Sequence, residues 1–116
     1  MSKDISTKGD VYSFGILLLE IITGSSPTDG KFNGSTTLHD FVARAFPNNI
    51  YQVVDPTMLH ADLDATNLMD NCIIPFVKIG LSCSMSLPKD RPEMGQVASM
   101  ILEIKHATSN RHDRLN

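Results

Sequence analysis

Residues 9–20 read GDVYSFGILLLE, and two isoleucines follow at positions 21 and 22. The apolar members of this run are Val11, Phe14, Ile16, Leu17, Leu18, Leu19, Ile21 and Ile22. On a helix these side chains surround the axis, and a helix that is apolar on all sides is buried on all sides. A buried strand is the alternative for a short apolar run, but about twelve residues without a turn signal favour a helix.

Signals at both ends bound this helix. Asp10 precedes the apolar run and suits the N-cap position, where a carboxylate accepts hydrogen bonds from the free amides of the first turn. Gly24 followed by Pro27 supplies a stop. We therefore predict a buried helix over residues 10–23.

Three further helices follow from the apolar spacing. Residues 38–46 carry apolar side chains at intervals of three and four and stop before Pro47. Residues 72–85 are largely apolar, with Pro75 either in the first turn or kinking a longer helix that starts near Ala65. After Pro92, residues 93–107 follow the 3.6-residue period of a helix. The predicted fold class is all-α, with an exposed loop at 25–37 and a short helical turn or extended segment at 48–59.

Size and composition fit one domain. The chain has 116 residues, of which 41% are apolar and 20% charged, as is ordinary for a globular protein. We assign the domain to residues 1–107 and interpret the polar residues 108–116 as a flexible tail.

Charge and apolar length exclude two classes of partner. The net charge of -3 gives no basic excess, so we expect neither a nucleic-acid partner nor a membrane-binding patch. The longest apolar stretch, residues 14–22, is broken by Gly15 and Glu20 and is shorter than the ~20 residues that a bilayer requires. We expect no direct membrane span and no signal peptide, which leaves a protein partner.

Two cysteines, Cys72 and Cys83, lie about three helical turns apart, on one face of the predicted helix. No cluster of further Cys or His residues accompanies them. We therefore predict two reduced core thiols rather than a disulfide or a metal site.

The GDVYSFG segment resembles the buried helix at the centre of the large lobe of protein kinases. Residues 89–92, which read KDRP, resemble the arginine motif near the end of that domain. Plant receptor-like kinases, especially leucine-rich-repeat receptor kinases, are similar in YSFG at 12–15, TGxxP at 23–27 and VVDP at 53–56. The resemblance runs from Ile5 to about Lys105.

The resemblance implies structural roles for Asp10, Gly15 and Arg91. In the family, the aspartate matching Asp10 holds the backbone of the catalytic loop. The arginine matching Arg91 forms a buried ion pair with the glutamate of an A-P-E motif, and no A-P-E occurs in this sequence. The intact family phosphorylates serine and threonine in proteins with ATP and Mg²⁺, at the cytosolic side of the plasma membrane.

The sequence contains no G-x-G-x-x-G loop, no V-A-I-K lysine and no D-F-G aspartate, the groups that hold ATP and Mg²⁺ in kinases. We therefore predict no cofactor in this chain, and we assign no catalytic, cofactor-binding or metal-binding residue. His39, His106 and His112 have no metal spacing and no nucleophile partner in the sequence.

Residues 60–67, HADLDATN, match the letters of the kinase catalytic loop, H-x-D-L-x-x-x-N. We reject this match because the loop should precede the helix at residue 10. The arginine of the motif is replaced by Ala61, and the phosphate-facing lysine by Asp64. His60 and Asp62 are instead expected to be surface residues.

Two hypotheses remain. In the first, the chain is a C-terminal piece of the large lobe of a receptor-like serine/threonine kinase, inactive alone; a truncated gene model would give the same sequence. In the second, it is a non-catalytic helical module that binds a kinase or a regulator through residues 38–46. On the first, part of residues 14–22 should face water and Arg91 should lack its partner, so that Arg91→Met would be neutral or mildly stabilising.

Overall fold

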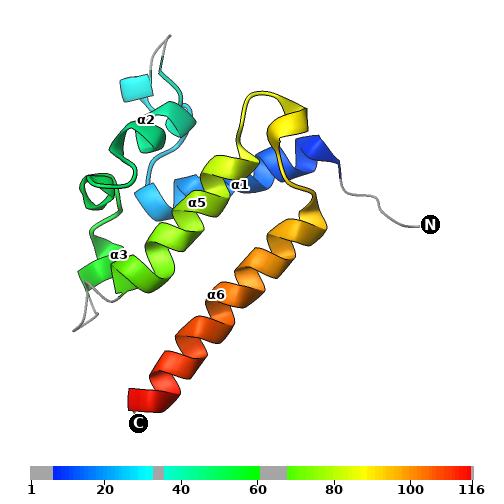
Figure 1. Cartoon of the computed structure of the whole chain (residues 1–116). Coiled ribbons are helices and arrows are strands. Elements are labelled where there is room, and N and C mark those ends of the chain that lie inside the picture. The colour runs from blue at the N-terminus through cyan, green and yellow to red at the C-terminus, as the bar shows by residue number, and fades with distance from the viewer. Residues whose placement is uncertain (1–6, 33–35, 61–67, 116) are drawn as a thin grey trace.

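The structure is a computed structural model that describes residues 7–32, 36–60 and 68–115. Within these ranges it contains helices and no strand, which confirms the all-α prediction (Figure 1). The α-helices are α1 (Lys8–Thr23), α2 (Leu38–Ala45), α3 (Thr57–His60), α5 (Ile74–Cys83) and α6 (Met94–Leu115). Short 3-10 turns occur at Gly30–Phe32, Ile50–Gln52 and Pro88–Asp90, and a π-helical segment occurs at Met69–Ile73.

Helix α1 begins with a capping box. The Thr7 hydroxyl accepts a hydrogen bond from the Asp10 amide at 3.1 Å, and the Asp10 carboxylate accepts one from the Thr7 amide at 3.0 Å. The prediction that Asp10 is the N-cap is therefore wrong: Thr7 is the N-cap and Asp10 is the third helical residue. The reciprocal pair satisfies two backbone donors, and the helix begins two residues before the predicted start.

Helix α1 ends as predicted at Gly24. This residue has φ 70°, a left-handed conformation that is costly for side chains with a Cβ. Its amide donates to Glu20 O at 2.8 Å, which closes the last turn.

Helices α1 and α5 cross at two glycines. A Cβ placed on Gly15 would lie 2.6 Å from Cys83 Cβ and 2.9 Å from Gly80 O. A Cβ placed on Gly80 would lie 2.6 Å from Leu19 Cδ2. The absence of side chains at both positions is what lets the two backbones approach so closely.

The core forms two clusters. One includes Leu19, Ile22, Phe32, Leu38, Val42, Ile50, Val54, Ile73 and Val77. The other lies between the first half of α1, α5 and α6 and consists of Val11, Ile79, Cys83 and Val97. Helix α1 contributes to both clusters.

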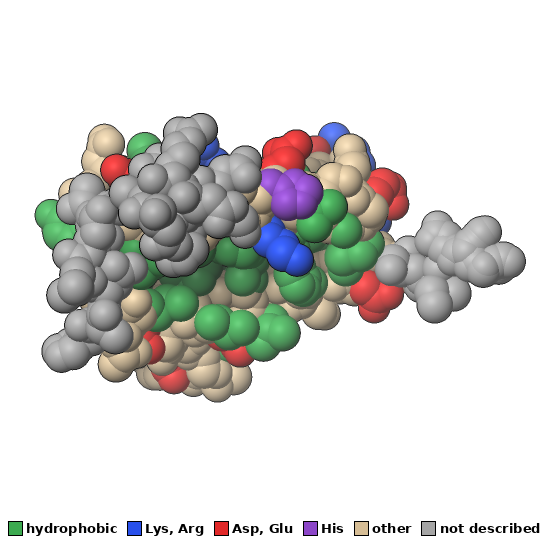
Figure 2. All heavy atoms as spheres, turned by 90° about the horizontal axis from the view of Figure 1, so that it is seen from below, with side chains coloured by type: hydrophobic (Ala, Val, Ile, Leu, Met, Phe, Trp, Pro, Cys, Tyr) green, Lys and Arg blue, Asp and Glu red, His purple; other side chains and the backbone are tan. Residues whose placement is uncertain are grey.

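One face of α1 is not covered. Leu17 is 51% exposed and Ile21 55% exposed, whereas Leu19 between them is fully buried. The prediction that α1 is buried on all sides is therefore wrong for this face, and the expectation that part of residues 14–22 faces water is confirmed. Apolar side chains also gather at the surface in the view from below (Figure 2).

The segment before α5 resolves the alternatives for Pro75. Helical structure is continuous from residue 68 to Cys83, and the Ile74 amide bonds to Met69 O across a wide π turn. Since proline has no amide proton and its ring crowds the preceding turn, this widened turn accommodates Pro75 inside a longer helix. The α-helical part ends at Cys83, two residues before the predicted end.

Helix α6 is longer than predicted. It runs from Met94 to Leu115, past the predicted end at residue 107 (Figure 1). Residues 108–115 contain neither glycine nor proline, so the polar composition that suggested an end supplies no stop signal. The 48–59 region forms the helical turns Ile50–Gln52 and Thr57–His60 rather than an extended segment.

Candidate functional site

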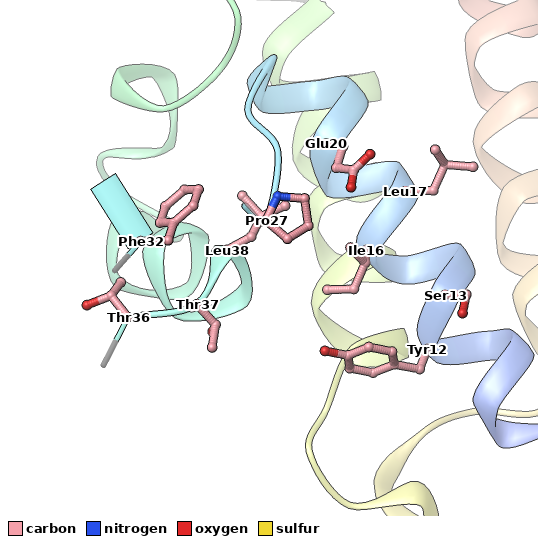
Figure 3. A pocket seen from close by; sticks show the side chains of 10 residues that line it. All are labelled: Tyr12, Ser13, Ile16, Leu17, Glu20, Pro27, Phe32, Thr36, Thr37 and Leu38. Carbon is pink, nitrogen blue, oxygen red and sulfur yellow. The ribbon is translucent and has the colours of Figure 1, made fainter. Parts of the chain in front are cut away.

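A groove of about 480 Å³ lies along the exposed face of α1. It is lined by Tyr12, Ser13, Ile16, Leu17, Glu20, Pro27, Phe32, Thr36, Thr37 and Leu38. Figure 3 shows Tyr12 and Ile16 pointing from α1 toward Thr37 and Leu38 on the opposite wall. Glu20 is the one charged side chain among these lining residues. The groove can therefore hold an apolar segment but offers little chemistry of its own.

The wall opposite α1 is fixed by local contacts. The Phe32 ring packs edge-on against Phe41 of α2, with 5.2 Å between centroids, and Lys31 Nζ lies 5.1 Å from the Phe41 centroid. The Ser26 amide donates to the Asp29 carboxylate at 3.1 Å, which folds the loop back on itself. Packing and hydrogen bonds therefore hold this wall of the groove in place.

Thr37 begins α2 at the edge of the same groove. Its hydroxyl accepts a hydrogen bond from the Asp40 amide at 3.0 Å, so Thr37 is the N-cap of α2. Thr37 lines both the α1 groove and a second, polar pocket of about 330 Å³. The two cavities are therefore neighbours on one side of the molecule.

Arg91 lies at the polar pocket, and each of its three side-chain nitrogens donates a hydrogen bond. Its guanidinium donates from Nε to Met85 O at 2.7 Å, from Nη1 to Lys8 O at 3.0 Å and from Nη2 to Ser86 O at 3.1 Å. It also lies over the Tyr12 ring, 4.8 Å from the centroid. The glutamate partner implied by the family is not among these contacts, and backbone carbonyls take its place.

The polar pocket also brings His39 to Ser84. His39 Nδ1 lies 2.6 Å from Ser84 Oγ, and Ser84 Oγ donates to Gly80 O at 2.7 Å. The Ser84 hydroxyl has one proton, and when that proton is given to Gly80 O the bond between His39 Nδ1 and Ser84 Oγ is donated by the histidine. In that arrangement the histidine cannot remove the serine's proton, so the pair is not an activated nucleophile. The contact joins residues 45 positions apart, and no local sequence pattern indicates it.

The predicted motif residues do not converge on one site. Asp10 completes the capping box at the start of α1, and Arg91 donates to Lys8 O in the same first turn. Gly15 lies further along α1, at the crossing with α5. Lys8 connects Arg91 to the turn that holds Asp10, and no motif in the sequence indicates this role.

Catalytic chemistry is not assembled in the described part of the chain. Among the residues that the structure describes, no three His, Cys, Asp or Glu side chains group to hold a metal ion. Of the rejected catalytic-loop match, residues 61–67 lie outside the described ranges, and His60 ends α3. Cys72 and Cys83 are both free, as predicted, and burial raises the pKa of each thiol above its ordinary value of 9.0.

Over residues 7–32, 36–60 and 68–115, no helix is long and apolar enough to cross a membrane.

Comparison with known proteins gives consistent matches. The family model described as protein tyrosine and serine/threonine kinase matches residues 1–101. A probable LRR receptor-like serine/threonine-protein kinase of Arabidopsis thaliana is 37% identical over 100 residues, 86% of this chain and 10% of that protein. The receptor kinase-like protein Xa21 of Oryza sativa subsp. japonica is 35% identical over 115 residues, 90% of this chain and 11% of that protein. A brassinosteroid LRR receptor kinase of the same rice is 34% identical over 100 residues, 86% of this chain and 8% of that protein. The chain thus spans about a tenth of the length of these curated relatives.

Proposed function

Because this chain belongs to the protein tyrosine and serine/threonine kinase family, with plant receptor-like serine/threonine kinases among its relatives, we propose that it forms the helical support of a kinase large lobe. In this role the protein of which it is part would transfer phosphate from ATP to serine or threonine at the cytosolic side of the plasma membrane. The 116 residues would anchor the catalytic segments without binding ATP or Mg²⁺ themselves.

The open face of α1 carries this proposal. Its groove of about 480 Å³ is walled mainly by apolar side chains, and Leu17 and Ile21 are about half exposed on the same helix. Apolar surface left in water on an otherwise buried helix marks a contact site. In the family, the helix matching α1 packs against the catalytic loop and the activation segment, which would cover this face.

The sequence supports the proposal that the 116 residues alone do not catalyse phosphoryl transfer. Phosphoryl transfer depends on positioning and on charge neutralisation by phosphate-binding and Mg²⁺-binding groups. None of the corresponding motifs occurs in the 116 residues. The α1 groove does not replace them, because its one charged lining residue, Glu20, would repel a phosphate.

Calorimetric titration of the purified 116-residue chain with Mg-ATP tests this proposal. We expect no saturable heat of binding and no labelled phosphate on a generic protein substrate. Asp62→Ala serves as the control for the rejected catalytic-loop match and should leave both results unchanged. Saturable Mg-ATP binding by the parent chain would refute the proposal.

A non-catalytic interaction module is the second candidate. The Arg91 network favours it, because the guanidinium is satisfied by carbonyls within the chain and needs no glutamate from elsewhere. Such a module would bind a kinase or a regulator through the exposed side of α2. A sharp, reversible unfolding transition of the isolated monomer above ~65 °C would favour this candidate over the first.

A further inference from the structure

Lys8 and Arg91 are joined in both directions, although they lie 83 positions apart. Lys8 Nζ donates to Arg91 O, and Arg91 Nη1 donates back to Lys8 O at 3.0 Å. Each residue thus uses its side chain to hold the other's backbone. The connection fixes the first residue of α1 to the segment that leads into α6.

Lys8 occupies an unfavourable place for a cation. It is the first residue of α1, where the helix dipole repels positive charge. Its side chain is only 30% exposed, so the charge is not simply in water. The Glu93 carboxylate, 3.3 Å from Lys8 Nζ, compensates part of the lysine's charge. The Glu93 side chain is 72% exposed, and exposed ion pairs of this kind contribute little to stability. The contact with Arg91 O is therefore the interaction that distinguishes this lysine from an ordinary surface residue.

Arg91 is held by contacts to its side chain and to its backbone. Met85 O and Ser86 O hold two of its nitrogens from the loop after α5, and Lys8 O holds the third. Lys8 Nζ holds the Arg91 backbone itself. With both ends fixed, the guanidinium lies over the Tyr12 ring at the wall of the polar pocket.

We propose that Lys8 is a positioning residue for Arg91, forming with it a two-way latch that keeps the guanidinium stacked on Tyr12. The latch joins α1, the loop after α5 and the start of α6 at one point. It does not depend on the proposed kinase role, since every group in it belongs to the described residues.

Tyrosine optical activity can test the latch directly. The sequence contains two tyrosines and no tryptophan, so a Tyr51→Phe background leaves Tyr12 as the sole source of near-ultraviolet tyrosine signal. In that background we compare Lys8→Met, Lys8→Arg, Arg91→Met and, as the matched control, Lys89→Met. The Lys89 side chain is 79% exposed, and the ion pair that it forms within the described residues is with Asp90, at 3.8 Å.

We expect Lys8→Met to lose most of the Tyr12 near-ultraviolet circular dichroism at a temperature where the far-ultraviolet spectrum remains helical. Arg91→Met should lose it as well, and the double variant should lose no more than Arg91→Met alone. Lys8→Arg should retain the signal, and Lys89→Met should leave it unchanged. Should Lys8→Met lose its helical spectrum, Lys8→Ala, which also removes the donor and suits a helix, carries the same comparison.

A Lys8→Met chain that unfolds more easily yet keeps the parent Tyr12 signal would overturn the proposal, because Lys8 would then be structural without positioning Arg91. An unchanged signal in Arg91→Met would overturn it too, since the stacking would be absent. Neither outcome bears on Mg-ATP binding, so the latch and the proposed function fail separately.

Discussion

Replacing Gly15 with alanine tests the closest approach in the fold. The new Cβ would lie 2.6 Å from Cys83 Cβ, 2.9 Å from Gly80 O and 3.0 Å from Cys83 C. Carbon atoms prefer separations of about 3.5–4.0 Å. None of these neighbours is the end of a flexible side chain, so no rotamer change can relieve the contact. The helices α1 and α5 must move apart instead.

The expected cost combines two opposing terms. Overpacking a core costs roughly 1–3 kcal/mol, and a clash with backbone belongs at the upper end of that range. Alanine in place of glycine within a helix returns about 0.8–1.0 kcal/mol. We therefore expect Gly15→Ala to lower the free energy of unfolding by about 2 kcal/mol, which is roughly 10 °C in Tm for a domain of this size.

Urea denaturation followed by far-ultraviolet circular dichroism measures this difference, with two matched glycines as references. A Cβ placed on Gly95 in α6 would meet no atom within 4 Å, so Gly95→Ala should raise stability by about 0.5 kcal/mol. The new Cβ of Gly80→Ala would meet the Leu19 side chain, which can adjust in part. Its effect on the free energy of unfolding should therefore fall between those of Gly15→Ala and Gly95→Ala. A Gly15→Ala chain as stable as the parent would refute the close crossing of α1 and α5.

Burial and bonding in the folded chain lead to three further predictions. Arg91→Met should lower the free energy of unfolding by roughly 1–3 kcal/mol in urea denaturation, contrary to the sequence-based expectation, because three carbonyls lose a charged donor; a neutral result would show that solvent replaces them. Leu17→Ala should change stability by less than about 1 kcal/mol while reducing self-association in sedimentation experiments, whereas Leu19→Ala should cost about 2–5 kcal/mol; equal costs would contradict the open face. Burial raises the pKa of Cys72 and Cys83, so their contribution to the free energy of unfolding is complete below the ordinary thiol pKa of 9.0 and declines as the pH rises beyond it. Both thiols should react slowly with a thiol reagent in the folded chain and completely after denaturation. Fast reaction of both thiols in the native chain would contradict this.

The sequence predicts the positions of the four main helices because their apolar periods are long and their stop signals are local. Gly24 ends α1 as its conformational freedom requires, and α2 begins at the predicted residue 38. The T-x-x-D spacing of Thr7 and Asp10 also indicates a capping box, but the apolar run by itself favours a start at Asp10. Local pattern therefore explains the four helices and about half of their ends.

The partners of Arg91 were not predictable in the same way. Its acceptors are the backbone oxygens of residues 8, 85 and 86, and every residue type has such an oxygen. Only the folded chain shows which carbonyls meet the guanidinium. The His39–Ser84 contact has the same origin, because it depends on how α2 and the end of α5 meet.

The two sides of α1 differ in how well they are packed, and the difference can be tested. On the side that faces α5, α1 is fully packed: Gly15 allows the two backbones to approach, and the Lys8–Arg91 latch bonds the first turn to groups of this chain. On the groove side α1 is not fully covered, since Leu17 and Ile21 remain half exposed. Changes toward α5 should therefore alter the stability of the isolated chain. Changes in the groove should instead alter what the chain associates with, which is the behaviour expected of a support whose catalytic segments pack on its open face.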